Sequence, residues 1–117
     1  MDPQEILEIT EEITREAGEI VRHYFGEHHQ ITHKGEVNLV TEADHAVEEH
    51  VIKRLHQAFP IHNVLAEEQG GATLDNLGPL WIIDPLDGTN NFAHNFPHVG
   101  ISLALWVDGA PLIGVIY

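Results

Sequence analysis

The chain has 117 residues, 43% of them hydrophobic, which is enough for one modest core and predicts a single domain. Five Lys and Arg against nineteen Asp and Glu give a formal net charge of −14, which argues against binding nucleic acid through bulk charge. Cysteine is absent, so disulfides and thiolate metal sites are excluded. There is no run of about 18 uncharged apolar residues and no basic, apolar leader, so we expect no membrane span and a cytoplasmic location.

Two amphipathic helices are expected in the first half of the chain. Residues 2–5 form a typical helix start, with Asp2 as N-cap, Pro3 at the first helical position and Glu5 at the third. Apolar residues then recur at three- and four-residue steps up to Gly26. Residues 28–37 read as a polar connector, and the second helix is expected to begin at Thr41 and to end before Pro60.

Short apolar runs predict the strands. Residues 63–66 and 80–83 are expected to form buried strands, separated by a glycine-rich loop over residues 69–78. A short helix is expected near residues 90–94. Residues 101–107 and 110–117 flank Asp108-Gly109, a favoured two-residue hairpin turn. Both faces of this hairpin are largely apolar, so we expect it to lie between covering layers.

The segment Asp-Pro-Leu-Asp-Gly-Thr, residues 84–89, predicts the chemistry. Asp84 and Asp87 follow a buried strand, where two carboxylates are costly to desolvate unless a hard divalent cation such as Mg²⁺ neutralises them. Gly88 allows the backbone to approach a ligand, and Thr89 is a candidate N-cap for a helix whose free N–H groups would face an anion. These features together predict a phosphate-ester site. Asp-Pro and Asp-Gly are also common turn dipeptides, so a purely structural interpretation of the two acids stays open.

Glu67 and Glu68 supply a second acidic strand end, after residues 63–66. This pair, followed by Trp-Ile-Ile-Asp-Pro-Leu-Asp-Gly-Thr-Asn-Asn-Phe at residues 81–92, resembles the signature of the inositol monophosphatase family, within the lithium-sensitive, Mg²⁺-dependent phosphatases. Residues 39–44 and 96–102 also fit the family. The resemblance implies an α+β fold of layered αβαβα type, of which residues 1–117 would be the N-terminal, metal-binding half.

The resemblance also implies a set of site residues. Glu67, Asp84 and the carbonyl of Leu86 would hold one Mg²⁺, and Asp84 and Asp87 would hold a second. Glu67, together with Thr89 backed by Asp44, would accept the proton of the attacking water, and the backbone N–H groups of Gly88 and Thr89 would hold the phosphate. A structural alternative for Asp44 is a capping-box partner of Thr41, three residues earlier.

The substrate implied by the resemblance is a small phosphorylated polyol or sugar, with inositol monophosphate the leading candidate. Relatives that cleave fructose 1,6-bisphosphate or 3′-phosphoadenosine phosphate share the Asp-Pro-Leu-Asp-Gly-Thr core, although the following Asn-Asn-Phe favours the inositol type. The complete protein would be a homodimer. A hypothesis of another class is a binding partner of the transcription machinery, as for some bacterial relatives. The ten histidines are scattered and suggest pH-dependent net charge rather than one metal site.

Overall fold

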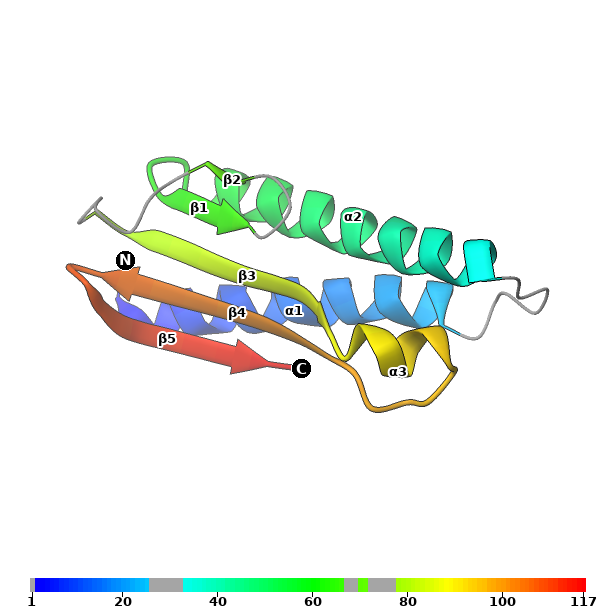
Figure 1. Cartoon of the computed structure of the whole chain (residues 1–117). Coiled ribbons are helices and arrows are strands. Elements are labelled where there is room, and N and C mark those ends of the chain that lie inside the picture. The colour runs from blue at the N-terminus through cyan, green and yellow to red at the C-terminus, as the bar shows by residue number, and fades with distance from the viewer. Residues whose placement is uncertain (1, 26–32, 67–69, 72–77) are drawn as a thin grey trace.

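The computed structural model describes the backbone of residues 2–25, 33–66, 70–71 and 78–117. It is an α+β structure, as predicted (Figure 1). None of the described helices is long and apolar enough to cross a membrane. The elements in chain order are α1 (Pro3–Tyr24), α2 (His33–Ala58), β1 (Asn63–Ala66), β2 (Gly70–Gly71), β3 (Leu80–Asp87), α3 (Thr89–Ala93), β4 (Gly100–Val107) and β5 (Ala110–Ile116).

The five strands form one mixed sheet in the order β2-β1-β3-β4-β5. β1 and β3 are parallel, and every other neighbouring pair is antiparallel. The two long helices run antiparallel to each other on one face of this sheet, behind it in Figure 1. α1 contacts β4 and β5, whereas α2 contacts β3 and α3. The short helix α3 therefore lies at the end of the sheet where β3 finishes.

The start of α1 is as predicted. The carboxylate of Asp2 accepts hydrogen bonds from the backbone N–H groups of Gln4 at 2.8 Å and Glu5 at 3.1 Å. The buried side of α1 includes two threonines that the apolar pattern does not predict. Thr10 donates its hydroxyl to the carbonyl of Ile6 and Thr14 donates to that of Thr10, so both hydroxyls are satisfied within the helix.

The predicted start of the second helix is wrong, because α2 begins at His33 rather than at Thr41. The connector assignment rested on polar composition and Gly35, but a glycine inside a helix costs only about 1 kcal/mol relative to alanine and does not end it. Thr41 is thus an interior helical residue, and the capping-box interpretation of Asp44 is wrong as well. The predicted apolar side of this helix is confirmed, since it is buried at Ala43, Val47, Val51 and Leu55.

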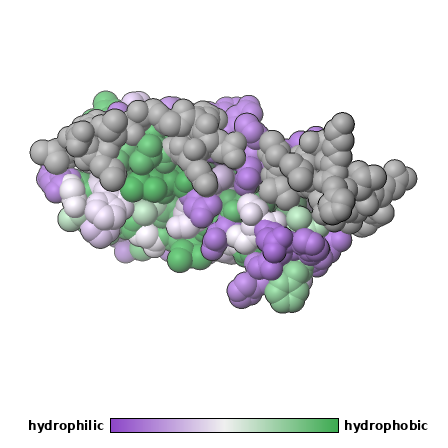
Figure 2. Space-filling view, in the orientation of Figure 1, coloured by the Kyte–Doolittle hydropathy of each residue, from purple (hydrophilic) through white to green (hydrophobic). Residues whose placement is uncertain are grey.

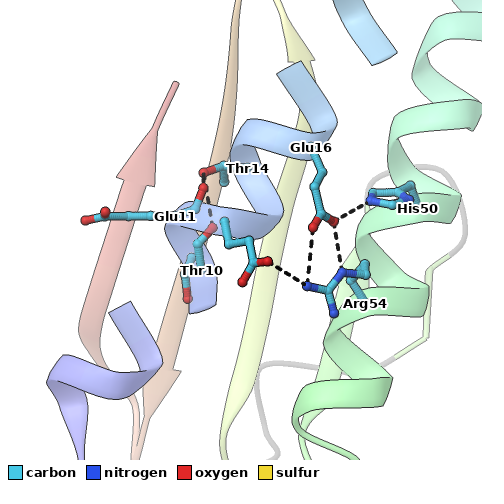
Figure 3. A network of polar contacts seen from close by, with 7 residues as sticks. Thr10, Glu11, Thr14, Glu16, His50 and Arg54 are labelled. Atoms are coloured by element: carbon cyan, nitrogen blue, oxygen red, sulfur yellow. Dashed lines mark hydrogen bonds and ion pairs between the residues drawn. The ribbon is translucent and has the colours of Figure 1, made fainter. Parts of the chain in front are cut away.

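A polar cluster joins α1 to α2 beside the apolar contacts (Figure 3). Oε1 of Glu16 accepts a hydrogen bond from Nε of Arg54 at 2.9 Å and lies 2.8 Å from Nε2 of His50. The hydrogen bond from Arg54, and then that from His50, hold the pKa of Glu16 below its usual value. One carboxylate on α1 therefore binds two side chains one helical turn apart on α2.

The sheet has one covered and one open face. Alternate residues such as Trp81, Ile83, Leu103, Leu105 and Ile113 are buried against the helices. On the opposite face, no described segment covers Leu112, which is 48% exposed, or Ile116, which is 82% exposed. Figure 2 shows apolar side chains over the sheet on this side and hydrophilic ones around α3. The expectation that both faces of the hairpin are covered therefore holds for one face of the described structure.

The strands differ from the prediction in two places. β3 continues beyond Ile83 to Asp87, and Gly70–Gly71, inside the predicted loop, pair with β1 as β2. The hairpin of β4 and β5 is as predicted. Its turn residues Asp108 and Gly109 both have positive φ, 53° and 78°, which is the requirement of the favoured two-residue turn.

Candidate active site

The candidate site is the corner where β3 ends and α3 begins. Asp84 pairs with Ser102 of β4, and Asp87 pairs with Gly100. Two residues of β3, Pro85 and Leu86, therefore oppose one residue of β4, which is the count of a β-bulge. Proline has no N–H to give to the ladder and is tolerated at a bulge. This explains why the strand continues through Pro85 instead of breaking there.

The bulge decides which side chains leave the core. Regular alternation would put Asp84 and Leu86 on the same face of the sheet. Instead Leu86 is buried in the core cluster, Asp84 is half-buried and Asp87 is exposed. A leucine side chain has no ligand atom, so Leu86 could bind a cation only through its backbone carbonyl, which is the role that the family resemblance implies for it.

Gly88 makes the turn from β3 into α3 in a conformation that suits glycine. Its φ is +90°, and a Cβ at this position would lie 2.7 Å from the carbonyl oxygen of His98. Gly88 is also the N-cap of α3 and has no side chain with which to cap the helix. The prediction of Thr89 as N-cap is therefore wrong: Thr89 is the first helical residue, and its side chain is exposed.

Two residues of α3, Asn91 and Phe92, hold the helix in place. Nδ2 of Asn91 donates to the carbonyl of His98 at 2.9 Å, so this carbonyl is approached by Gly88 and held by Asn91. Phe92 is buried and meets Phe25 edge to face, with ring centres 5.6 Å apart. The sequence analysis used Asn91 and Phe92 only as family markers and missed this structural role.

The remaining predicted site residues come from β1 and α2. β1 pairs in parallel with β3 up to Ala66 opposite Ile83, and Asp84 follows Ile83 directly. Glu67 follows Ala66 in the sequence but lies outside the described residues, so its proposed ligation stays a prediction. Asp44 is half-buried on α2, and α2 packs against α3, the helix that begins with Thr89. The fold thus brings the elements that carry Asp44 and Thr89 together.

The donor set at the corner suits a hard cation. Asp84, Asp87 and the carbonyl of Leu86 offer only oxygen, which is what Mg²⁺ prefers. Across the part of the chain that the structure describes, no group of three or more His, Cys, Asp or Glu side chains is arranged to hold a metal, so a third carboxylate would have to come from elsewhere. A cavity of about 310 Å³ lies between α1 and the start of β4, and its lining includes Gly100, the residue opposite Asp87, but neither Asp84 nor Asp87.

Two polar residues, Glu48, which is buried, and His62, which is half-buried, were not predicted from the sequence. Glu48 is fully buried on α2, one turn after Asp44. Its position beside the buried Val47 and Val51 is the sequence feature that could have predicted this burial. His62 accepts a hydrogen bond from the indole of Trp81 at 3.0 Å. Neither residue is part of a motif for phosphate chemistry.

The chain matches one family over nearly its whole length. The profile of the inositol monophosphatase family covers residues 2–117. Inositol monophosphatase 2 of Solanum lycopersicum is 43% identical over an alignment that covers 97% of this chain and 44% of that relative. The solved inositol monophosphatase of Anabaena (Nostoc) sp. superimposes with a TM-score of 0.79 at 40% identity, covering 97% of this chain and 40% of that one.

Inositol monophosphatase II of Staphylococcus aureus superimposes with a TM-score of 0.83 at 30% identity, over 96% of this chain and 42% of that one. The chain thus spans less than half the length of the relatives it matches. The match of the family profile over residues 2–117, together with the likeness of sequence and fold, shows that the chain belongs to the inositol monophosphatase family.

Proposed function

We propose that a protein containing this chain hydrolyses small phosphate monoesters with the help of Mg²⁺, with inositol monophosphate as its leading substrate. The observation that carries the proposal is the corner at the end of β3. There a bulge after Asp84 buries the side chain of Leu86 in the core and leaves Asp87 exposed, while Asp84 is half-buried. The strand then passes through Gly88, which has no side chain to cap the helix, into the start of α3.

The proposed metal ligands are the oxygen donors of this corner and the preceding strand. Glu67, Asp84 and the Leu86 carbonyl are assigned to one Mg²⁺, and Asp84 and Asp87 to a second. When bound, Mg²⁺ would supply an activated water and stabilise negative charge on the phosphate and the leaving oxygen. The assignment is supported by the exposure of Asp87 and the partial exposure of Asp84, since both carboxylates remain accessible to a cation.

Proton transfer is assigned to Glu67 and to Thr89 supported by Asp44. The exposed position of Thr89 at the first turn of α3 supports this role, as does the packing of α2 against α3. The backbone N–H groups of Gly88 and Thr89 are proposed to hold the phosphate, because the first N–H groups of a helix have no partner within it. Gly88 has no side chain that would block such an approach.

Inositol monophosphate is preferred as substrate because the relatives reported above carry the name inositol monophosphatase. No described residue specifically favours fructose 1,6-bisphosphate, 3′-phosphoadenosine phosphate or the transcription machinery. We also propose that the complete protein is a cytoplasmic homodimer. The absence of cysteine is compatible with that compartment, and sedimentation of the complete protein tests the dimer.

The test is Asp84→Asn in the complete protein, with Asp108→Asn as the matched control. Asp108 is an exposed carboxylate in the β4–β5 turn, far in sequence from the corner, and Asn tolerates its positive φ. Asp84→Asn is expected to abolish Mg²⁺-dependent phosphate release from inositol monophosphate and to leave the circular dichroism spectrum unchanged. Asp108→Asn is expected to keep both. Near-normal turnover by Asp84→Asn would remove Asp84 from the mechanism.

A further inference from the structure

His62 lies where the chain passes from α2 into β1, and it is the acceptor for a buried donor. The indole Nε1 of Trp81, the second residue of β3, donates to Nδ1 of His62 at 3.0 Å. Trp81 is completely buried, and an indole N–H is a donor only. Nδ1 of His62 must therefore be unprotonated, and the ring is the neutral tautomer with its proton on Nε2.

Aromatic packing keeps the imidazole in this position. The ring of His62 stacks on that of Phe59, with centres 4.9 Å apart and planes 3° apart. Phe59 is itself buried and packs against Trp81 at 5.4 Å. The backbone N–H of His62 also donates to the carbonyl of Phe59 at 3.0 Å. The last residues of α2, the start of β1 and the start of β3 therefore meet in one aromatic cluster, which we define as Phe59, His62 and Trp81.

The cluster sits at the beginning of the only parallel pairing in the described sheet. β1 and β3 share four residue pairs, from Asn63 opposite Leu80 to Ala66 opposite Ile83. The backbone N–H of Asn63 donates to the carbonyl of Pro79 at 3.0 Å, next to the cluster. A slip of one residue in so short a pairing would turn every side chain of β1 to the other face. It would also shift the end of β1 relative to Asp84.

We propose that His62 is a positioning residue: in its neutral form it accepts the Trp81 indole and so fixes the register of β1 on β3, and protonation of its imidazole releases that hold. The link from this register to catalysis rests on the proposed function, because Asp84 and Glu67, which follows β1 in the sequence, are proposed metal ligands. The hydrogen bond and the register can be measured without metal or phosphate.

Protonation acts directly on the hydrogen bond. An imidazolium carries a proton on both nitrogens, so it cannot accept from the indole, and the Trp81 donor would stay buried without an acceptor. Burial lowers the pKa of His62 below its usual value. The unfolded chain therefore takes up this proton first as the pH falls. The stabilisation of the folded chain by neutral His62 is complete above about pH 6.5, and it is lost as the pH falls through the pKa of His62 in the folded chain.

The experiment uses the dilute 117-residue chain with Trp106→Phe, which leaves Trp81 as the sole tryptophan of the two in the sequence. Trp81 emission is followed from pH 8 to pH 5, since an adjacent imidazolium quenches an indole. His62→Asn is the conservative variant, because its Oδ1 occupies the same branch point as Nδ1 and accepts without titrating. His56→Asn is the matched control, an exposed histidine in the last turn of α2.

We expect Trp81 emission to fall with a midpoint below pH 6.5, a transition that disappears in His62→Asn and persists in His56→Asn. Amide hydrogen exchange measured by mass spectrometry supplies the register readout at pH 7.5. His62→Leu should speed exchange in residues 63–66 by about tenfold or more, His62→Asn should restore slow exchange, and residues 101–116 should not change. A transition that survives in His62→Asn, or slow exchange in β1 of His62→Leu, would overturn the proposal. Absence of phosphatase activity in the complete protein, measured separately, would overturn the proposed function only.

Discussion

Gly88 and Gly109 both adopt a positive φ, +90° and +78°, but their surroundings differ. A Cβ at Gly88 would lie 2.7 Å from the His98 carbonyl, whereas a Cβ at Gly109 would meet nothing within 4 Å. Gly109→Ala therefore carries only the cost of a left-handed residue, about 1 to 2 kcal/mol. Gly88→Ala adds a backbone clash and should cost about 2 to 4 kcal/mol in the free energy of unfolding.

Urea denaturation of the two variants, compared at constant slope, measures the difference. The excess loss in Gly88→Ala over Gly109→Ala reports the close approach to His98 alone, because the conformational cost is common to both. Equal losses would mean that the loop carrying His98 moves away without cost.

Thr89 offers a second prediction at the scale of one residue. In the complete protein, Thr89→Ala should lower kcat by about 100-fold or more, because its hydroxyl is proposed to position the attacking water. The Mg²⁺ affinity should be unchanged, since the hydroxyl is not assigned as a ligand. Asn90→Ala, at the next exposed position of α3, is the control and should keep kcat within a few-fold. A shifted metal titration with normal kcat at saturating Mg²⁺ would reverse this assignment.

The two long helices are joined by a contact whose strength should depend on pH. Glu16 receives hydrogen bonds from Arg54 and His50, and its pKa is lowered in the folded chain, chiefly by Arg54. The lowered pKa means that the folded state binds the Glu16 proton less readily than the unfolded state. The stabilisation is therefore present above the unfolded pKa, about 4.3, and is lost as the pH falls through the folded pKa.

Glu16→Gln should accordingly lower the free energy of unfolding by up to about 1 kcal/mol at pH 7, since the groups are partly exposed. The difference from the parent chain should shrink below about pH 4, where Glu16 becomes protonated. Glu19→Gln is the control on the same helix, because Glu19 makes only a surface pair with Arg22 at 3.7 Å and is 69% exposed. If both variants lose the same stability, the contact between α1 and α2 contributes nothing beyond a surface charge.

The whole molecule carries an apolar sheet face that the described structure leaves open. Leu112 and Ile116 are exposed on β5, the strand at the edge of the sheet. Exposed apolar edge strands invite pairing with another chain. The 117-residue chain alone should therefore associate, and it should be a poor phosphatase, because it spans less than half the length of its relatives.

Size-exclusion chromatography combined with a phosphate-release assay tests both expectations on one sample. Ile116→Lys should reduce association by placing a charge on the open edge strand, without restoring activity. A monodisperse 13.1 kDa monomer with full inositol monophosphatase activity would contradict this prediction.

Much of the local structure was predictable because its signals are themselves local. The Asp2 cap needs only the two following N–H groups, and the β4–β5 turn needs only Asp108 and Gly109. The buried side of α2 follows from apolar residues spaced by one turn. Composition misled at the start of α2, where one glycine and polar neighbours predicted a connector up to residue 37, although the helix already begins at His33.

In the candidate site, too, some features were predictable from the sequence and others depend on the tertiary structure. By itself the sequence determined the family, the donor types and the order in which Asp84, Leu86, Asp87 and Gly88 follow one another. Only the tertiary structure decided that a bulge opposite β4 buries Leu86 and exposes Asp87, that His98 leaves no room for a side chain at position 88, and that His62 accepts from Trp81. Each of these depends on backbone or side chains brought together by sheet pairing and helix packing, and no local pattern of residues encodes such a meeting.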